Sequence, residues 1–378
     1  MASFADAVPV TGTLMISANT GWNLVNFRSG IIKAAVTRGW RVVAAVPSDP
    51  VAEETLTRIG CIVEPVLLDS VGLNPARDVR TLLQFRRLMA QYRPSHYFSW
   101  TPKANVYGAL AARATGVRVT LNVSGLGSVF ITDTVLTRFV KLIYRFAFSS
   151  ARTIFFQNAT DQALFVAARL ARPDQSALLP GSGIDLEHFV PSLPVPAGDA
   201  VTFLMIARLL RDKGVLEYVE AADRLRHQGL RARFQLLGGV GVANPTAIGR
   251  EQLESWMRAG IVDYIGEVDD VRPFVDAADC VVLPSYREGT ARVLLEAGAM
   301  ARPVVATDVP GCRDPVEDGV TGFLCPPRSA SALASALARM AALSPDERHR
   351  MGLAGRAKIE REYDQRLVVA RYLAELDR

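Results

Sequence analysis

The sequence predicts an α/β protein with two doubly wound domains, each a parallel sheet with helices on both faces. Short apolar runs alternate with helical stretches along the chain, which is the pattern of right-handed crossovers in parallel sheets. The alternation stops at residues 191–198, PSLPVPAG, and then starts again, so we expect a hinge there. The 378 residues are enough to give each half its own core.

In the first half, strands and helices follow one another regularly. An apolar run at residues 14–18 is followed by the polar turn Asn19-Thr20-Gly21 and by a helix at about 25–37. Further strands are expected at 42–46, 61–67, 97–99, 119–123 and 153–157, with helices at about 79–92 and 106–115.

The second half repeats this order. Strands are expected at 201–206, 234–237, 262–265, 280–283 and 304–306, helices at 215–228, 251–259 and 291–300, and mostly helix from residue 330 onward. The pattern predicts domains at 1–190 and 199–362 and a closing helix at 363–378, for which the first domain is a candidate partner. Ligands of such sheets bind beyond the carboxyl ends of the strands, so we expect the site residues in the loops there.

Composition excludes several protein classes. Hydrophobic residues make up 49% of the chain and charged residues 21%, which excludes collagen, a long coiled coil and wholesale disorder. The N-terminus lacks the pattern of a signal peptide, and no run of about 18 apolar residues is present. Cys61, Cys280, Cys312 and Cys325 form no CxxC pair and have no zinc-finger spacing. We therefore expect a cytoplasmic enzyme without a structural metal.

The charge of the chain is uneven. Residues 1–195 carry 19 Lys and Arg against 12 Asp and Glu, whereas residues 196–378 carry 24 against 26. A basic half suits nucleic acid, an anionic membrane or a phosphorylated substrate. We expect no nucleic-acid partner, because the chain has no zinc spacing, no recognition helix and no interleaved aromatic and basic stripe.

The densest group of candidate site residues lies in the segment CVVLPSYREGTARVLLE. It predicts a buried strand, a polar turn that contains Glu288, and a helix that begins near Thr290 and places Glu296 about 12 Å from Glu288. The backbone N–H groups of Gly289, Thr290 and Ala291 would favour an anion such as a diphosphate. The two carboxylates could then accept hydrogen bonds from two sugar rings. The alternative is a loop charge and a solvated helix residue.

A second cluster, ARLLRDKG, follows the strand at 201–206. Arg208 and Lys213 are two fixed cations in a loop, and such cations can hold a diphosphate and neutralise a departing nucleotide. Arginine contributes a bidentate fork and lysine a point charge. The alternative is an exposed basic turn paired with Asp212.

Together these motifs resemble the retaining glycosyltransferases of family 4, which have the GT-B fold. The second half contributes Arg208 to Lys213, Gly238-Gly239, Gly266-Glu267-Val268 and the Glu-x7-Glu pattern of Glu288 and Glu296. The first half contributes Asn19-Thr20-Gly21-Trp22 with Asn26-Phe27-Arg28, Thr101-Pro102-Lys103-Ala104 before Tyr107-Gly108, and Gly125-Leu126-Gly127. The set is similar to the branch that builds capsular, exopolysaccharide and lipid-linked oligosaccharide chains.

The resemblance implies that the two domains face each other across a cleft, the first binding the acceptor and the second the nucleotide sugar. Arg208 and Lys213 would bind the donor diphosphate and, with Glu288, would be the catalytic residues. Glu288 would contact the transferred sugar, and Glu296 the ribose hydroxyls. The other implied donor contacts are Gly21 from the first domain, Gly238, Gly289, Thr290, and Glu267 and Val268 near the base.

The resemblance also implies a mechanism without a metal or another cofactor. We find no convincing Asp-x-Asp metal motif. Retention without an obvious nucleophile implies front-face attack, in which the leaving phosphate takes the proton of the acceptor. Many relatives carry a His-x-His near the end of the fourth strand, and here Trp100 occupies the position of the second histidine. The role of that histidine is therefore not transferred to this chain.

Four residues of the first half are candidate acceptor ligands: Asn19, Lys103, Gly125 and Gly127. Lys103 could meet a phosphate. The Gly-Leu-Gly motif is not a dinucleotide fingerprint, because Phe130 stands where the last glycine is required. A loop that lets an acceptor phosphate approach backbone amides and a plain turn both remain open.

The stretch from residue 135 to residue 152 is a candidate membrane contact. Arg138, Lys141, Arg145 and Arg152 lie within about 60° of one another on a helical wheel, and apolar residues fill much of the rest. Such a helix can lie on an anionic membrane with its cations near the headgroups. The alternative is a core helix with a basic solvent-facing stripe.

The sequence therefore predicts a retaining glycosyltransferase of bacterial surface polysaccharide biosynthesis. We expect it to move a sugar from a nucleoside diphosphate, with UDP favoured, to a polyprenyl-diphosphate-linked saccharide at the cytoplasmic face of the inner membrane. The alternative is a sugar-nucleotide epimerase or hydrolase on the same fold, which needs no lipid acceptor.

Overall fold

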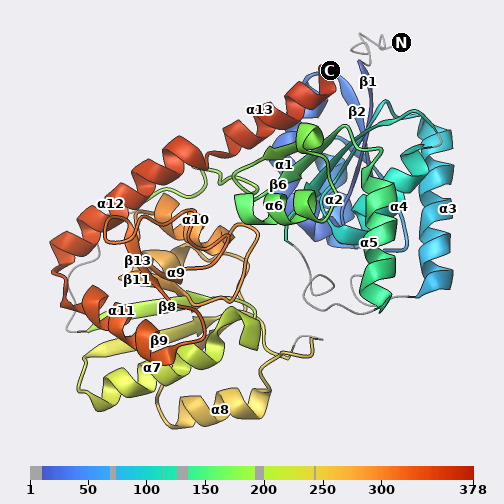
Figure 1. Ribbon diagram of the computed structural model, residues 1–378. Coiled ribbons are helices and arrows are strands. Elements are labelled where there is room, and N and C mark those ends of the chain that lie inside the picture. Colours follow the sequence, from blue (N-terminus) through green and yellow to red (C-terminus); the bar gives the residue numbers. More distant parts are fainter. Residues whose placement is uncertain (1–10, 69–73, 114, 126–134, 192–199, 242–243) are drawn as a thin grey trace. The chain divides into compact units, whose positions relative to one another are not determined.

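The computed structural model describes residues 11–68, 74–113, 115–125, 135–191, 200–241 and 244–378 (Figure 1). The chain forms two units. Unit 1 runs to Ser182 and includes Arg366–Arg378, and unit 2 is Gly183–Gln365. Each unit is described by itself below.

Unit 1 is built on a parallel sheet in the order β3-β2-β1-β4-β5-β6-β7. Its strands are β1 (Gly12–Ser17), β2 (Trp40–Val46), β3 (Cys61–Pro65), β4 (His96–Ser99), β5 (Arg118–Val123), β6 (Thr153–Phe156) and β7 (Ser176–Leu178). Every described pairing in this sheet is parallel. Successive residues of one strand enter different cores, as with Met15 on one face and Leu14 on the other. The apolar strands are therefore buried on both faces.

The helices of unit 1 cover both faces of this sheet. They are α1 (Gly21–Thr37), α2 (Pro50–Arg58), α3 (Pro75–Tyr92), α4 (Pro102–Arg113), α5 (Val135–Phe148), α6 (Ala159–Ala167), the 3-10 turn η2 (Pro173–Gln175) and α13 (Gln365–Leu376). Side chains of α1, α2 and α13 enter one core, and side chains of α3 to α6 enter the other. The side chains of Thr20, Asp49, Asn74 and Asn158 cap α1, α2, α3 and α6 by accepting backbone N–H bonds.

Unit 2 repeats this architecture with a six-stranded parallel sheet in the order β10-β9-β8-β11-β12-β13. Its strands are β8 (Val201–Ile206), β9 (Ala232–Leu237), β10 (Asp263–Gly266), β11 (Cys280–Leu283), β12 (Val304–Thr307) and β13 (Gly322–Cys325). Its helices are the 3-10 turn η3 (Arg211–Lys213), α7 (Val215–His227), α8 (Arg250–Arg258), α9 (Arg272–Ala277), α10 (Arg292–Ala299), α11 (Ala330–Ala342) and α12 (Pro345–Glu362). Side chains of α7, α8 and α11 enter one core, and those of α9 and α10 the other.

Both sheets confirm the predicted fold class, but the unit boundary differs from the prediction. The sequence pattern predicts residues 183–190 in the first domain, yet Ile184 and Phe189 lie in a core of unit 2. Ile184 donates to the carbonyl of Tyr363 at 2.8 Å and accepts from the N–H of Gln365 at 2.9 Å. The chain therefore joins unit 2 before the predicted hinge, of which residues 192–198 lie outside the described residues.

The predicted helical stretch at 135–152 is shorter in the structure. The helix α5 ends at Phe148, and Arg152 lies after a turn, immediately before β6. Its guanidinium donates to the backbone carbonyl of Arg378 at 3.2 Å. Arg152 therefore does not share a helical stripe with Arg145, and the predicted stripe is wrong at this residue.

Each sheet has one point at which the strand order reverses. In unit 1 it lies between β1 and β4, and in unit 2 between β8 and β11. At such a point the loops after two neighbouring strands run in opposite directions. A crevice then forms beyond the carboxyl ends of the strands, and α/β proteins bind their ligands in this crevice. Of the predicted site residues, the loops after β8 and β11 carry Arg208, Lys213 and Glu288, and the loop after β1 carries Asn19.

Candidate active site

The central feature of the unit 2 site is an ion pair between Lys213 and Glu288. The Lys213 ammonium donates to a carboxylate oxygen of Glu288 across the reversal point of the sheet. The two side chains are 23% and 16% exposed, so the pair is largely screened from solvent and still accessible. The structure thus brings together two predicted site residues that are 75 positions apart in sequence.

The turn that carries Lys213 is held from two sides. The carbonyl of Asp212 accepts from the N–H of Tyr286 at 2.9 Å, which joins η3 to the loop after β11. On the other side, the N–H of Arg211 donates to the carbonyl of Thr246 at 2.8 Å. These bonds fix the backbone of the lysine from two neighbouring loops.

Gly214 lets this turn approach the loop after β11. Its φ is +76°, and a Cβ at this position would lie 2.1 Å from the carbonyl oxygen of Pro284. A side chain at residue 214 would therefore push the lysine turn away from the loop that carries Glu288.

Arg208 follows β8 directly and is exposed. Within the described part of the chain, its guanidinium forms no ion pair or hydrogen bond. An exposed arginine without a protein partner at a sheet's reversal point is available to an anionic ligand.

Glu296 lies on α10, one turn after Arg292. The Arg292 guanidinium donates to its carboxylate at 2.8 Å, and the Glu296 side chain is only 13% exposed. Burial raises the pKa of the Glu296 carboxyl above its ordinary value, while the nearby Arg292 acts in the opposite direction. Sequence reasoning missed Arg292, although its spacing of four residues on a predicted helix was the signal.

The start of α10 agrees with the predicted helix at 291–300 to within one residue. The helix begins at Arg292, and Ala291 is its N-cap. The N–H of Ala291 donates to the carbonyl of Gly311 at 2.8 Å, and that of Glu288 donates to Pro310 at 3.1 Å. The N–H of Ala291 is therefore engaged by the protein and does not serve an anion as predicted.

The predicted donor contacts Gly238, Glu267 and Val268 lie at the ends of β9 and β10. Gly238 has a φ of +140°, and a Cβ there would lie 2.0 Å from the carbonyl oxygen of Ala207. A carboxylate oxygen of Glu267 lies 3.1 Å from the position of a Cβ on Gly239. Glu267 is exposed, and Val268 packs against a core of unit 2. The two glycines thus allow the ends of β8, β9 and β10 to come close together.

Tyr286 is a further residue of the site that sequence reasoning did not select. Its hydroxyl donates to the Glu217 carboxylate at 2.6 Å, and the Arg328 guanidinium lies 4.7 Å from its ring centre. Burial, with the bond to Glu217, raises the pKa of Tyr286 to about 12. This tyrosine is the third residue after the buried strand β11, and that position was the available signal.

In unit 1, Asn19 lies in the loop after β1, and Gly21 is the first residue of α1. A Cβ on Gly21 would lie 2.6 Å from the Cβ of Ala52 on α2. The absence of a side chain at Gly21 therefore has a packing reason, whatever ligand it meets.

Trp100, at the position of the histidine in many family-4 relatives, is 1% exposed. Its indole N–H donates to the hydroxyl of Tyr372 on α13 at 2.7 Å, and the Arg28 guanidinium lies 5.0 Å from the indole ring centre. Because the indole is enclosed by these neighbours, it is a structural residue of unit 1.

Lys103 forms an ion pair with a residue of α3. Its ammonium lies 2.9 Å from the Asp78 carboxylate, and both side chains are mostly buried. A phosphate at Lys103 would have to compete with this carboxylate. The residue remains a candidate acceptor ligand, but it is already partnered.

The remaining acceptor candidates are only partly described. Gly125 has open space beside its Cα and lines a cavity of about 10 Å³, roughly the volume that one water requires, together with Trp100 and Asn122. Gly127 lies outside the described residues.

The predicted membrane helix α5 has an exposed apolar and basic face. Leu142 is 62% exposed and Phe146 is 53% exposed, while Lys141 and Arg145 lie beside them. The side chain of Arg138 lies outside the described residues. Phe148, by contrast, is fully buried, so only part of the helix is a candidate contact.

Among the described residues, no group of three or more His, Cys, Asp or Glu side chains is placed to hold a metal ion. No described helix combines the length and the apolar character that crossing a membrane requires.

Comparison with known proteins identifies both halves. The model of the glycosyl transferase 4-like domain matches residues 27–181, and the model of glycosyl transferases group 1 matches residues 200–342. The chain is 29% identical to the N,N'-diacetylbacillosaminyl-diphospho-undecaprenol alpha-1,3-N-acetylgalactosaminyltransferase of Campylobacter jejuni, over 96% of this chain and 97% of the relative. It is 25% identical to the capsular polysaccharide biosynthesis glycosyltransferase CapM of Staphylococcus aureus, over 77% of this chain and 78% of the relative.

Solved structures agree in fold. Anabaena HepE in complex with UDP-glucose superimposes with a TM-score of 0.77 over 97% of this chain and 99% of that chain, at 18% identity. Sucrose-phosphate synthase from Thermosynechococcus elongatus gives a TM-score of 0.77 at 20% identity, over 96% of this chain and 97% of that chain. The chain is a glycosyltransferase of the family-4 type with the GT-B fold.

Proposed function

We propose that the protein transfers a sugar, with retention, from a nucleoside-diphosphate sugar to a polyprenyl-diphosphate-linked saccharide in bacterial surface polysaccharide biosynthesis. The observation that carries this proposal is that the Lys213–Glu288 pair and the exposed Arg208 all lie in the loops at the reversal point of the unit 2 sheet. The lipid-linked acceptor is supported by the full-length similarity to a transferase whose name specifies a diphospho-undecaprenol-linked substrate.

The proposed donor site is defined by the charged side chains at the carboxyl edge of the unit 2 sheet. Arg208 and Lys213 hold the diphosphate, and Glu288, which keeps the lysine in place before the donor arrives, accepts hydrogen bonds from the transferred sugar. Glu296, oriented by Arg292, binds the ribose hydroxyls. We favour UDP because HepE, a protein of the same fold, holds UDP-glucose.

The proposed reaction depends on stabilising the negative charge of the leaving phosphate and does not need a protein side chain as the base. The two cations neutralise the phosphate that leaves, and this phosphate then takes the proton of the acceptor hydroxyl on the same face of the sugar. The buried Trp100 supports this assignment, because its position supplies no side chain that can exchange a proton with the acceptor. We propose that the reaction proceeds without a divalent metal.

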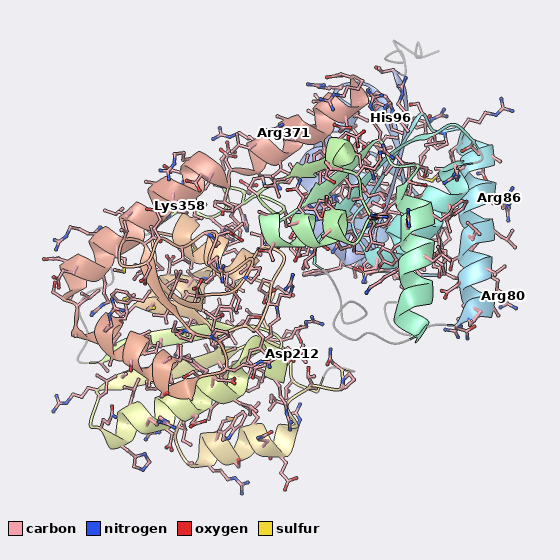
Figure 2. The ribbon with its side chains drawn as sticks, in the orientation of Figure 1. Arg80, Arg86, His96, Asp212, Lys358 and Arg371 are labelled. Atoms are coloured by element: carbon pink, nitrogen blue, oxygen red, sulfur yellow. The ribbon has the colours of Figure 1, made fainter. Side chains whose placement is uncertain are left out.

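The acceptor side of the proposal rests on unit 1. Figure 1 shows α3, α4 and α5 as neighbouring helices, and α4 contacts both of the others. Besides α5, the helix α3 exposes Val79 and Leu83 together with Arg80, Arg86 and Arg87, and its one acidic residue, Asp78, is buried. Figure 2 shows Arg80 and Arg86 on the outer side of α3. Two basic faces with exposed apolar residues suit an anionic bilayer, where a lipid-linked acceptor resides.

Vesicle sedimentation tests the membrane contact. The protein should bind vesicles with anionic lipid and not purely zwitterionic ones, and Arg80→Glu with Arg86→Glu should reduce binding at least fivefold. The matched control reverses two exposed arginines of α8 in unit 2, Arg250 and Arg258. Equal losses in both double variants would indicate that only net charge matters and would remove the specific role of α3.

A transfer assay tests the function itself. Radiolabelled UDP- and GDP-sugars are incubated with a polyprenyl-diphosphate-linked saccharide, with and without EDTA, and the lipid and free-sugar products are separated. We expect label in the lipid fraction, retention at the anomeric carbon and no effect of EDTA. Free sugar or an epimerised donor, formed at the same rate without lipid, would instead support the epimerase or hydrolase alternative.

A further inference from the structure

The loop that carries Glu288 is in direct contact with a second loop of unit 2. The loop between β12 and β13, residues 308–321, lies next to the loop between β11 and α10, residues 284–291. Two hydrogen bonds connect the loops, and a third comes from Thr307, the last residue of β12. Thr307 donates its hydroxyl to the carbonyl of Ser285, Pro310 accepts from the N–H of Glu288 at 3.1 Å, and Gly311 accepts from the N–H of Ala291 at 2.8 Å.

Gly311 sits at the closest approach of the two loops. Its φ is +77°, a value that side-chain-bearing residues rarely adopt. A Cβ at this position would lie 2.4 Å from the carbonyl oxygen of Gly289 and 2.5 Å from that of Glu288. These are backbone atoms and cannot rotate away, so even one methyl group at residue 311 must move the segment that carries Glu288.

The β12–β13 loop is braced by hydrogen bonds within it and by an ion pair to α12. At its start, the N–H of Gly311 donates to the Asp314 carboxylate at 2.9 Å. At its end, the N–H of Glu317 donates to the Thr321 hydroxyl at 2.8 Å, and the Glu317 carboxylate lies 3.2 Å from the ammonium of Lys358 on α12. These contacts oppose a shift of the loop that would relieve a clash at residue 311, so the Glu288 segment would have to move.

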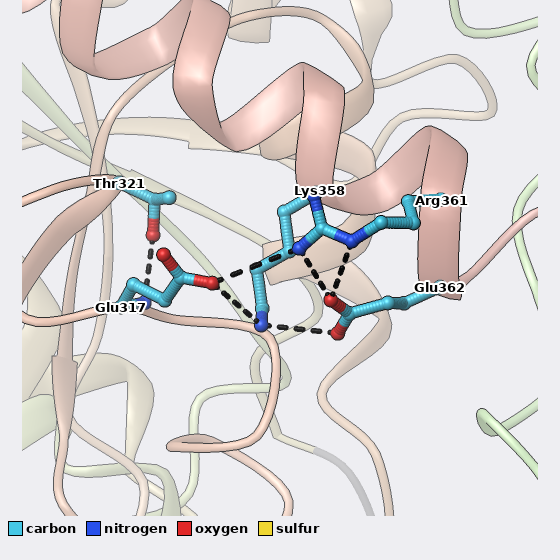
Figure 3. Close-up of polar contacts among 5 residues, drawn as sticks. All are labelled: Glu317, Thr321, Lys358, Arg361 and Glu362. Carbon is cyan, nitrogen blue, oxygen red and sulfur yellow. Dashed lines mark hydrogen bonds and ion pairs between the residues drawn. The ribbon is translucent and has the colours of Figure 1, made fainter.

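Figure 3 shows the ion cluster at this end of the loop. The largely buried Lys358 ammonium also lies 3.0 Å from the Glu362 carboxylate, and Arg361 pairs with the same carboxylate at 2.5 Å. Because Glu317 belongs to the loop and the other three residues to α12, the cluster ties the β12–β13 loop to that helix.

We propose that Gly311 is a positioning residue of the donor site, which sets the place of Glu288 through the β12–β13 loop and so determines how the sugar of the donor is held. Gly311 touches no substrate in this account and acts only through the backbone of residues 288–291. The inference rests on the proposed function where it names the sugar as the group affected. The backbone support itself does not depend on what the site binds.

The chain offers a matched control in the same loop. Gly319 has the same φ of +77°, but nothing lies within 4 Å of a Cβ at its position. Gly311→Ala and Gly319→Ala therefore impose similar backbone strain, and only the first creates a clash with the Glu288 segment. Any difference between the two variants measures that contact.

The first experiment measures the protection of backbone amides in the absence of any ligand. Hydrogen exchange of the full-length protein should show the Glu288 and Ala291 amides exchanging at least tenfold faster in Gly311→Ala than in the wild type, and unchanged in Gly319→Ala. If Gly311→Ala does not fold, Thr307→Val removes one of the three bonds without a clash and should speed the same amides by about threefold. Unchanged exchange at both amides in the variants that fold would overturn the proposal.

The second experiment measures by calorimetry how much the sugar contributes to donor affinity, with UDP and UDP-glucose as probes. Gly311→Ala should bind UDP within twofold of the wild type and lose at least fivefold in affinity for UDP-glucose, whereas Gly319→Ala should keep both affinities. Equal affinities in the two variants would overturn the positioning role. A wild-type protein that binds neither probe would instead count against the UDP-sugar donor, while the exchange experiment would still decide the backbone role.

Discussion

The two sheets share a topology, yet the edges at which their strand orders reverse are chemically different. In unit 2 this edge presents an exposed arginine and an accessible lysine–glutamate pair. In unit 1 the corresponding edge presents Trp100, sealed by Tyr372 of α13, and Lys103, already paired with Asp78. The same scaffold thus leaves charged groups ready for a ligand in one unit and uses polar and aromatic groups for internal contacts in the other.

The difference matches the division of labour that we propose. A diphosphate is compact and highly charged, so its site needs fixed cations. A lipid-linked saccharide carries much of its binding energy in the lipid and in the surface that contacts the membrane, so its site needs fewer charged side chains at the sheet edge. The predictions below test whether the two edges differ in this way.

Lys213→Ala should have the largest effect. The variant loses a cation at the diphosphate and leaves the Glu288 carboxylate without its ion-pair partner. We expect kcat/KM of the folded variant to fall at least 100-fold, about 2.7 kcal/mol in transition-state stabilisation. Lys33→Ala removes an exposed lysine of α1 and is the matched control. Equal activities of the two variants would reject the donor-site assignment.

Trp100→Phe should affect stability and leave the chemistry intact. The variant removes the bond to Tyr372 and creates a small cavity, so we expect the free energy of unfolding to fall by about 2 kcal/mol. Denaturant titration measures this loss. Tyr372→Phe removes the same hydrogen bond without the cavity, so it should reproduce the part of the loss that comes from the bond. If kcat of the folded variant fell tenfold or more, Trp100 would belong to the catalytic machinery and the contrast between the two edges would fail.

Glu296→Ala should weaken donor binding by at least tenfold, about 1.4 kcal/mol. The variant removes the carboxylate proposed to bind the ribose hydroxyls, together with its ion pair to Arg292. The effect should appear in KM for the donor and in the affinity for UDP. Glu360→Ala, which removes an exposed carboxylate that also pairs with an arginine of its own helix, is the control. A loss confined to kcat would place Glu296 elsewhere in the reaction.

His96 should give unit 1 a modest pH dependence. Burial, together with the charges of Arg118 and Arg152, lowers the pKa of His96 to about 4. The unfolded chain then binds more protons than the folded one between about pH 6.5 and 4, so stability falls as the pH falls through this window. We expect a loss of about 1 kcal/mol between pH 7 and 5.5, measured by chemical denaturation. His96→Gln should flatten this slope, and an identical slope would show that another group titrates.

Much of the fold could be predicted because both sheets are buried on two faces. Continuous apolar runs such as residues 201–206 and 280–283 therefore identified their strands without ambiguity. The elements that were missed are short or lie at an edge: α2, α6, α9, β7 and β13. Their few residues carry too little periodicity, and their stability comes from the neighbours on which they pack.

The site could be predicted only in part, because side-chain partners depend on the tertiary structure. The positions of Lys213 and Glu288 after two strands were readable, but their pairing required the knowledge that β8 and β11 are neighbours. The engagement of Lys103 by Asp78 and the burial of Trp100 by α13 join distant segments in the same way. The N–H of Ala291 was assigned to a ligand because the β12–β13 loop that accepts it had no signal in the sequence.

A crystal structure of the full-length protein with UDP tests the central claim most directly. The account predicts that the diphosphate contacts the Lys213 ammonium and the Arg208 guanidinium, with the ribose hydroxyls at Glu296. A nucleotide bound elsewhere, with the Lys213–Glu288 pair and Arg208 facing solvent, would contradict it.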